Sequence, residues 1–212
     1  MSVDGPVFVT GTDTDVGKTV VSAALTLGLD TSYWKPIQAG LTPTTDTECV
    51  RAWTGLPSQR FHAEAYRLRE PMSPHAAAEI DGVSIDVRRV VEATPKGPLV
   101  IEGAGGLMVP MAPGTLMVDL IEALACPVVL VARTSLGTLN HTLLSISELR
   151  RRSIGISGVV LNGEEHESNR RAIEEYGGVR VLGRIPPLRT IDAESLRRAF
   201  DALDIEPGRP RP

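Results

Sequence analysis

Residue types that mark special protein classes are scarce in this 212-residue sequence. Its two cysteines, Cys49 and Cys126, form no C-x-x-C pair. A disulfide scaffold is therefore not indicated, and both are expected to be reduced, packed thiols. The four histidines are too scattered along the chain to predict a zinc site. Any metal is therefore expected to be bound through oxygen atoms.

Long apolar segments and an excess of positive charge are also missing. No stretch of about 18 uninterrupted apolar residues occurs. The start, MSVDGPVFVT, has neither the basic residues nor the apolar length of a signal peptide. A net charge of -4 gives no field that would gather polyanions. We therefore expect a cytoplasmic protein with no membrane or nucleic-acid partner.

What is present is the pattern of an α/β protein. Short apolar runs alternate with helical segments, which predicts a mostly parallel sheet flanked by helices, of the P-loop NTPase type. We expect one domain over residues 1–206 and a tail at 207–212 that does not pack, because it has three prolines in six residues. The expected strands, nearly continuous in apolar residues and so buried on both faces, are Val7–Thr10, Tyr33–Ile37, Leu99–Glu102, Val128–Ala132, Gly158–Asn162 and Val181–Ile185.

Helical spacing fills the intervals between these strands. Helices are expected from Gly17 to about Leu29 and from about Thr138 to Arg152. Two further helices are marked by apolar residues at helical spacing, which we expect to face the core: Met117, Leu120, Ile121 and Leu124 in one, and Leu196, Phe200 and Leu203 in the other.

A phosphate-binding loop follows the first strand. The segment from Gly11 to Thr19 reads GTDTDVGKT at a strand-to-helix junction, where the backbone N–H groups of the loop can surround phosphate oxygens. Lys18 would reach the outer phosphates and the Thr19 hydroxyl would bind Mg²⁺. The strict template G-x-x-x-x-G-K-[ST] fails, because position 12 is Thr and the nearest glycine is Gly11. The loop alone predicts a protein that binds ATP.

Lysine is rare in a chain that is otherwise rich in arginine. Of 22 basic residues only Lys18, Lys35 and Lys96 are lysines. Because arginine can replace lysine wherever only a charge is needed, a retained lysine suggests a crowded site that suits a compact ammonium. Lys35 lies near the end of the second expected strand and is a candidate catalytic residue. The alternative is a solvated lysine at a strand edge, and Lys96 has the context of an ordinary turn.

Two carboxylates are candidates for binding Mg²⁺, which prefers oxygen ligands and few carboxylates. Glu102 ends an apolar strand and precedes a flexible Gly-rich segment, although it could also simply face water. Asp46 is less clear, because an Asp at this place could instead cap the helix that ends near Gly55.

Taken together, these segments resemble the dethiobiotin synthetase family. The resemblance runs from residue 7 to about residue 188, and its motifs are GTDTDVGKT at 11–19, Lys35-Pro36, Asp46, PMSPH at 71–75, EGAGG at 102–106, LGTLNH at 136–141 and GRIP at 183–186. It implies an ATP-dependent ligase that carboxylates 7,8-diaminononanoate with CO2, phosphorylates the carbamate with MgATP and closes the ureido ring, giving dethiobiotin, ADP and phosphate in biotin biosynthesis.

The resemblance also implies residue roles. Lys18 and Lys35 would be catalytic, and Thr19, Asp46 and Glu102 would hold Mg²⁺. The nucleotide would contact Asp15, Val16, Gly17, Lys18, Thr19, Val20, Glu102, Gly103, Ala104, Gly105, Asn162, Gly163, Ile185, Pro186 and Pro187. The diamine would contact Thr14, Lys35, Ala39, Gly137, Thr138, Leu139 and Asn140, with its carboxylate tail near the partner subunit of a homodimer. Asn140 could also be a plain helix cap.

Two positions depart from the family pattern. Ala39 stands where many members have a Ser or Thr hydroxyl, so one hydrogen bond to the diamine is missing or replaced. Asp15 stands where many members have Glu, and it is not assigned to the metal. The alternative function is a regulatory ATPase of the partition or cell-division type, but those proteins carry a further lysine near the start of the loop, and Thr12, Asp13 and Thr14 provide none.

Overall fold

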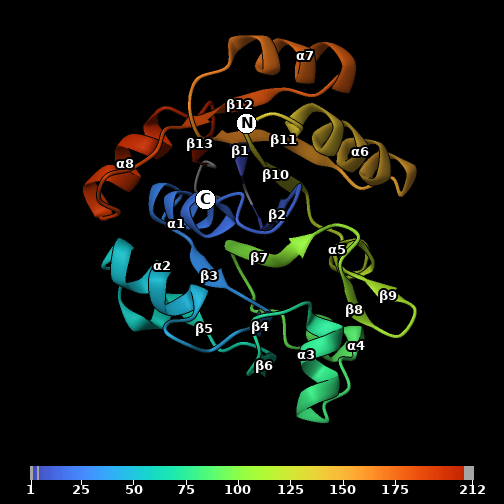
Figure 1. The fold of residues 1–212 in the computed structure, drawn as a ribbon. Coiled ribbons are helices and arrows are strands. Elements are labelled where there is room, and N and C mark those ends of the chain that lie inside the picture. The colour runs from blue at the N-terminus through green and yellow to red at the C-terminus, as the bar shows by residue number, and fades with distance from the viewer. Residues whose placement is uncertain (1, 4, 208–212) are drawn as a thin grey trace.

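A seven-stranded parallel sheet forms the centre of the described part of the chain (Figure 1). The computed structural model describes residues 2, 3 and 5–207. The strands lie in the order β12-β11-β10-β2-β7-β3-β5, and every neighbouring pair is parallel. Their bounds are β2 (Val7–Gly11), β3 (Ser32–Trp34), β5 (Phe61–His62), β7 (Leu99–Gly106), β10 (Val128–Arg133), β11 (Ile156–Asn162) and β12 (Val181–Ile185).

Both faces of the sheet are apolar and buried, as the continuous apolar runs predict. Successive side chains of a strand point to opposite faces. Val7 and Val9 of β2 accordingly join one core cluster, whereas Phe8 joins the other, and all three are almost completely buried. Each face therefore needs its own layer of helices.

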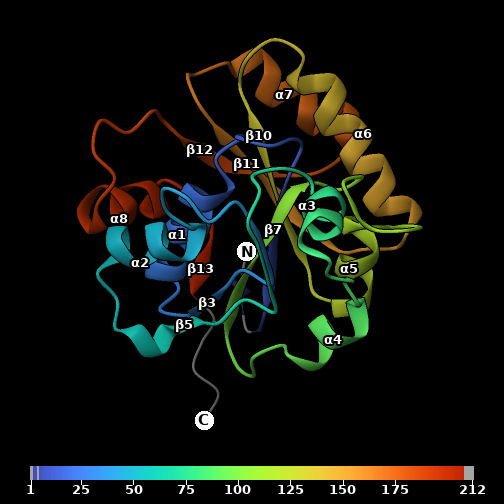
Figure 2. The ribbon, with the colours of Figure 1, turned by 60° about the horizontal axis from the view of Figure 1, so that its bottom comes forward.

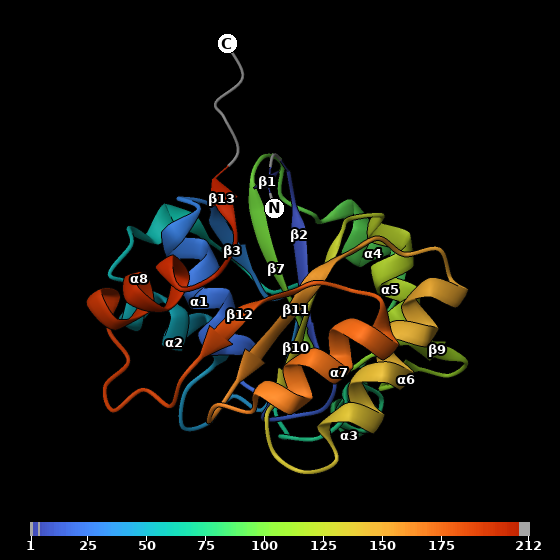
Figure 3. The same cartoon turned by 90° about the horizontal axis from the view of Figure 1, so that it is seen from above.

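Figure 3 shows these two layers on either side of the sheet, and Figure 2 shows the same separation from another angle. One layer consists of α1 (Lys18–Gly28), α2 (Asp46–Thr54) and α8 (Ala193–Asp201). The other consists of α3 (Pro74–Asp81), α4 (Val87–Glu92), α5 (Met117–Leu124), α6 (Thr138–Arg151) and α7 (Glu167–Gly177). The two predicted apolar stripes face the core: Leu196 and Phe200 pack in the first layer, and Leu120 and Ile121 in the second.

Three short strand pairs surround the main sheet. β1 (Ser2–Val3) pairs with β13 (Glu206–Pro207), β4 (Ile37–Ala39) pairs with β6 (Tyr66–Leu68), and β8 (Pro110–Ala112) pairs with β9 (Thr115–Leu116). A single 3-10 turn, η1 (Ser58–Arg60), precedes β5. Apart from Pro207, the expected tail lies outside the described residues. Over those residues, no helix is both long and apolar enough to cross a membrane.

Two of the expected strand boundaries were wrong. The run from Tyr33 to Ile37 is not one strand, because the chain leaves the main sheet at Lys35-Pro36 and then pairs with β6 as β4. Proline provides no N–H for a sheet, which accounts for a break at this point. The strand expected to end at Glu102 continues as β7 to Gly106, with a register shift against β2. Glu102 therefore lies inside a strand, and the Gly-rich segment after it belongs to the same strand.

The strand order brings three chemically distinct segments together. β7 lies between β2 and β3, and Glu102 pairs in register with Val9, two residues before the end of β2. The phosphate loop follows β2 and Lys35 follows β3. Because parallel strands end at one edge of the sheet, the loop, Lys35 and Glu102 meet there.

Candidate active site

The phosphate loop is shaped around two glycines. Gly17 has φ 95°, a left-handed backbone that favours glycine, and a Cβ there would lie 2.1 Å from Asn162 Nδ2. A Cβ on Gly11 would lie 2.7 Å from Val16 Cγ2 and 2.8 Å from the Asp13 carbonyl oxygen. The glycine that is displaced from the strict template is thus required where it stands, because the loop folds back over it.

Lys18 begins α1 and lies under the loop. Its ammonium donates a hydrogen bond to the Asp13 carbonyl at 2.9 Å, and its side chain is buried. Burial, and after it the positive charge of Lys35, lowers the pKa of Lys18 below its ordinary value, although Glu102 and Asp46 act in the opposite direction. Within the described residues no ion pair of Lys18 with a carboxylate forms, so its charge is available to an anion.

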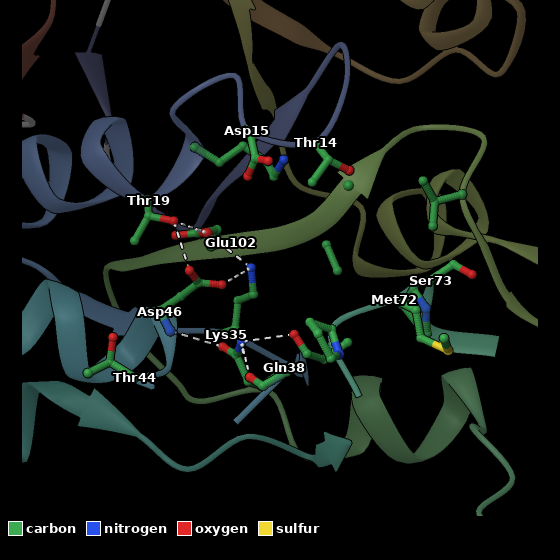
Figure 4. A pocket seen from close by; sticks show the side chains of 18 of the residues that line it. Thr14, Asp15, Thr19, Lys35, Gln38, Thr44, Asp46, Met72, Ser73 and Glu102 are labelled. Atoms are coloured by element: carbon green, nitrogen blue, oxygen red, sulfur yellow. Dashed lines mark hydrogen bonds and ion pairs between the residues drawn. The ribbon is translucent and has the colours of Figure 1, made fainter. Parts of the chain in front are cut away.

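Lys35 is instead held by two carboxylates (Figure 4). Its ammonium lies 2.7 Å from Asp46 Oδ2 and 3.0 Å from Glu102 Oε1, and it also donates to the Gly103 carbonyl at 3.0 Å. Burial lowers the pKa of Lys35, but the charges of Glu102 and Asp46 outweigh it and raise the pKa above its usual value. Lys35 is 3% exposed, which excludes the solvated strand-edge lysine considered from the sequence.

The same two carboxylates meet the hydroxyl of Thr19. Thr19 Oγ1 lies 3.0 Å from Asp46 Oδ1 and 3.0 Å from Glu102 Oε1. A hydroxyl has one proton and can donate to only one of these oxygens at a time. Glu102 is 1% exposed, so the water-facing alternative for this residue was wrong.

Asp46 is the first residue of α2 and does not cap it. Thr45 is the N-cap: its hydroxyl accepts from the Glu48 N–H at 3.2 Å, and Glu48 in return accepts from the Thr45 N–H at 2.8 Å. With the cap supplied by Thr45, the Asp46 carboxylate is directed to Lys35 and Thr19. Burial raises the pKa of Asp46, but the charge and hydrogen bond of Lys35 outweigh it and hold the pKa below its ordinary value.

These groups line a cavity of about 700 Å³. Of the residues expected to bind a ligand, twelve line it: Thr14, Asp15, Gly17, Lys18, Thr19, Val20, Lys35, Ala39, Asp46, Glu102, Ala104 and Gly105. Asp15 is exposed, with a left-handed backbone at φ 56°. The cavity thus joins the phosphate loop to the Lys35 segment in one space.

Other expected residues lie outside this cavity. Val16 is in the core, and the Gly103 carbonyl is bonded to Lys35. Asn162 donates to the Val16 carbonyl at 3.1 Å, so its side chain holds the backbone of the loop in place. The remaining expected residues that do not line the cavity are Gly163, Ile185, Pro186 and Pro187 after β11 and β12, and Gly137, Thr138, Leu139 and Asn140 at the start of α6.

The start of α6 differs from the expectation in one detail. Gly137 is the N-cap, in a left-handed conformation, and Asn140 is exposed inside the first turn, so the plain-cap reading of Asn140 was wrong. The Thr138 hydroxyl donates to the Arg133 carbonyl at 2.5 Å. A ligand at this place would therefore meet backbone N–H groups and the side chain of Asn140.

Several residues of the site were missed from the sequence. Tyr33 donates to Glu102 Oε2 at 2.9 Å, and Gln38 accepts from the Asp46 N–H at 3.1 Å while it donates to the Gly40 carbonyl at 3.0 Å. The missed cavity-lining residues are Gln38, Gly40, Thr42, Thr44, Pro71, Met72, Ser73, Pro74 and Val109. Two sequence features could have indicated some of these residues: Gln38 lies three residues after Lys35, and residues 71–74 belong to the PMSPH motif.

The arrangement is suited to a reaction at a phosphate group. One buried ammonium lacks a carboxylate partner in the described residues, a second is paired, and the Thr19 hydroxyl and two carboxylates lie beside the second. Among the described residues, no group of three or more His, Cys, Asp and Glu side chains gathers. A metal here would draw on a hydroxyl and on ligand oxygens besides the two carboxylates.

Comparison with known proteins identifies the family. A family model described as "AAA domain" matches residues 6–195. The chain is 53% identical over 195 residues to the ATP-dependent dethiobiotin synthetase BioD of Rhodopseudomonas palustris strain BisB5, covering 92% of each chain. It is 50% identical over 192 residues to the protein of the same name from Agrobacterium fabrum, covering 91% of each. The chain belongs to the dethiobiotin synthetase family.

Solved structures resemble this dethiobiotin synthetase family member in fold alone. A ParA family ATPase from Chlorobium tepidum matches with a TM-score of 0.55 at 14% identity, over 95% of this chain and 91% of that one. The cell-division protein MinD of Aquifex aeolicus matches with a TM-score of 0.56 at 13% identity, over 92% of this chain and 87% of that one. These likenesses reflect a shared P-loop architecture. They do not support the alternative function of a regulatory ATPase.

Proposed function

We propose that this chain is an ATP-dependent dethiobiotin synthetase, a ligase that forms C–N bonds. One amine of 7,8-diaminononanoate adds to CO2 and loses a proton, which gives a carbamate. A carbamate oxygen then attacks the γ-phosphorus of ATP and ADP leaves. The second amine attacks the carbamate carbon and loses a proton, phosphate leaves with the carbamate oxygen, and the ureido ring closes. The observation that carries this function is the pair of buried lysines beside two carboxylates in a chain about half identical to enzymes of that name.

In this reaction the two lysines have different tasks. Lys18, which has only a backbone partner among the described groups, would neutralise the outer phosphates of ATP as their charge shifts in the transition state. Lys35 would contact the carbamate and the transferred phosphoryl group while it remains between Asp46 and Glu102. No covalent enzyme intermediate is needed, so the contribution of the protein is positioning and charge stabilisation.

Thr19, Asp46 and Glu102 fit the Mg²⁺ that we propose. Octahedral ligands at 2.0–2.1 Å from the ion lie about 2.9 Å from one another. Thr19 Oγ1 is 3.0 Å from an oxygen of each carboxylate, so the donor spacing matches before the metal is bound. When bound, the ion would neutralise charge on the β- and γ-phosphates.

The remaining assignments rest on the family. We propose that Thr14 and the Ala39 segment face the diamine, and that the chain from Asn162 to Gly163 and Ile185 to Pro187 borders the adenine. In a homodimer, residues 137–140 would bind the carboxylate tail of the diamine at the subunit interface through helix N–H groups. The cytoplasmic location expected from the sequence stays a prediction.

The deciding experiment is phosphate release from ATP with Mg²⁺, 7,8-diaminononanoate and bicarbonate, with each component omitted in turn. We expect release to require all four, with dethiobiotin formed in equal amount by mass spectrometry. Phosphate release that continues without the diamine would contradict the synthetase and would favour a plain ATPase. Light scattering at micromolar concentration tests the dimer, and a fully active monomer would contradict the shared diamine site.

A further inference from the structure

Tyr33 is a buried polar side chain that the proposed reaction does not use. It lies in β3, two residues before Lys35, and is 0% exposed. Its ring packs in the core layer with α1 and α2, at 6.2 Å from the ring of Phe61. Its hydroxyl reaches through that layer to Glu102 Oε2, to which it donates at 2.9 Å.

The two oxygens of Glu102 are thereby given different partners. Oε1 faces the Thr19 hydroxyl and the Lys35 ammonium, both at 3.0 Å, whereas Oε2 faces Tyr33. A carboxylate in water rotates freely, and one that accepts hydrogen bonds at both oxygens does not. The Tyr33 hydroxyl therefore fixes which oxygen points to the place where Thr19 and Asp46 also converge.

Tyr33 donates this hydrogen bond through a phenol hydroxyl, which carries no charge. It satisfies a buried carboxylate oxygen without adding a charge to a cluster that already holds two lysines.

We propose that Tyr33 is a positioning residue that orients Glu102 for Mg²⁺, so that loss of its hydroxyl weakens the metal site without removing a ligand. This inference rests on the proposed function for the identity of the metal. Groups that hold metal ligands in place typically contribute about 10- to 100-fold to metal affinity or activity. Tyr33 lines no part of the cavity, so a direct contact with ATP or the diamine is not involved.

The neighbouring residue provides a matched control. Trp34 is equally buried but points to the opposite face of the sheet, where its indole N–H donates to the Ala63 carbonyl at 2.9 Å. Tyr33→Phe and Trp34→Phe each remove one buried hydrogen-bond donor from the same short strand. Tyr33→Phe also keeps the ring that packs beside Phe61, so it is expected to fold.

The test measures metal binding rather than turnover. Mn²⁺ affinity is determined by electron paramagnetic resonance with a non-hydrolysable ATP analogue, and binding of the analogue is measured by calorimetry with EDTA and with Mg²⁺. For Tyr33→Phe we expect about a tenfold loss of Mn²⁺ affinity and an equal loss of the Mg²⁺-dependent gain in nucleotide affinity. Metal-free nucleotide binding should stay within about twofold.

Two results would overturn the inference. One is a Tyr33→Phe protein whose Mn²⁺ affinity equals that of the wild type within about twofold. The other is an equal loss in Trp34→Phe, which would assign the effect to general loosening of β3. Either result leaves the wild-type requirement for the diamine intact, so failure of this inference is distinct from failure of the proposed function.

Discussion

The two buried lysines line one cavity and are held in opposite ways. Lys18, at the end of the phosphate loop, has a backbone carbonyl as partner, and its pKa is lowered by burial and by Lys35. Lys35, which follows β3, has two carboxylates as partners, and their charges raise its pKa despite burial. The first is an ammonium whose charge is incompletely compensated, and the second is a cation shared by two carboxylates, a group that keeps one net negative charge. The same residue type is therefore held in this site with opposite effects on its pKa.

The comparison predicts that loss of Lys18 affects activity most. In Lys18→Met the phosphate loop keeps its backbone donors but loses the charge that the γ-phosphate would meet. We expect kcat/KM for ATP to fall by about 10³-fold, the upper range for one preorganised group. The free energy of unfolding without ligand should not decrease, because a poorly compensated buried charge is removed. Steady-state kinetics and urea unfolding measure the two quantities.

The exposed Lys96 provides the control for Lys18→Met. Lys96→Met should leave both kinetics and stability unchanged. A Lys18→Met protein that loses less than about tenfold in kcat/KM would contradict the role of Lys18 at the γ-phosphate.

Loss of Lys35 should lower activity less but stability more. Lys35→Met leaves Asp46 and Glu102 facing each other without their cation. We expect kcat to fall by about 10²-fold. In EDTA the free energy of unfolding should fall by about 3–5 kcal/mol, the cost of breaking a buried pair from one side. Mg²⁺ should restore part of that loss, because it can compensate the same two carboxylates.

Urea unfolding of Lys35→Met, with and without Mg²⁺, checks the difference between the lysines. If Lys18→Met proved as destabilising as Lys35→Met, the contrast between an uncompensated and a compensated lysine would be wrong.

The sequence predicted that Lys18 and Lys35 belong to the site, but it did not predict which groups hold each of them. The strand-loop-helix pattern with Gly17 and Lys18 is local, so the phosphate loop and α1 were predicted within a residue. The rarity of lysine pointed to Lys35. Thr45 and Asp46 are neighbours, and either side chain could cap α2. In the structure Thr45 supplies the cap, which leaves the Asp46 carboxylate free to meet Lys35. The sequence alone does not decide between the two.

Long-range pairings account for the rest of what was missed. Pro36 accounts for the break after Trp34, but the course of the chain beyond it depends on the pairing of β4 with β6, about thirty residues further along the chain. The role of Tyr33 depends on the register of β3 against β7, which places its hydroxyl beside Glu102. A pattern of apolar residues contains neither fact, because it is the same for any pairing partner.

A third and smaller effect on activity is expected from loss of the hydrogen bond between Asn162 and the phosphate loop. Asn162 donates to the Val16 carbonyl at 3.1 Å from the end of β11. In Asn162→Ala we expect KM for ATP to rise about three- to tenfold with kcat nearly unchanged, as for the loss of one hydrogen bond. Asn169→Ala is the matched control, because its amide donates to the Thr134 carbonyl at 3.0 Å and not to the loop. Equal kinetics for both variants would show that this hydrogen bond does not position the loop.

The smallest effect is a difference in pH dependence. Lys35 has a folded-state pKa above 10.5, so its contribution to stability is fully present below pH 10.5 and is lost only as the pH rises through the higher folded value. Lys18 has a folded-state pKa below 10.5, so its cost to stability is fully present below that folded value and disappears as the pH rises to 10.5.

The Lys18→Met variant isolates the second of these slopes, because the contribution of Lys35 to stability is constant below pH 10.5. In EDTA, as the pH rises towards 10.5, the difference in free energy of unfolding between the wild type and Lys18→Met should move in favour of the wild type. Urea unfolding of both proteins at half-unit pH steps measures this difference. A difference that does not change with pH would mean that Lys18 is compensated in the folded protein, and its proposed readiness for a phosphate anion would then have to come from the loop alone.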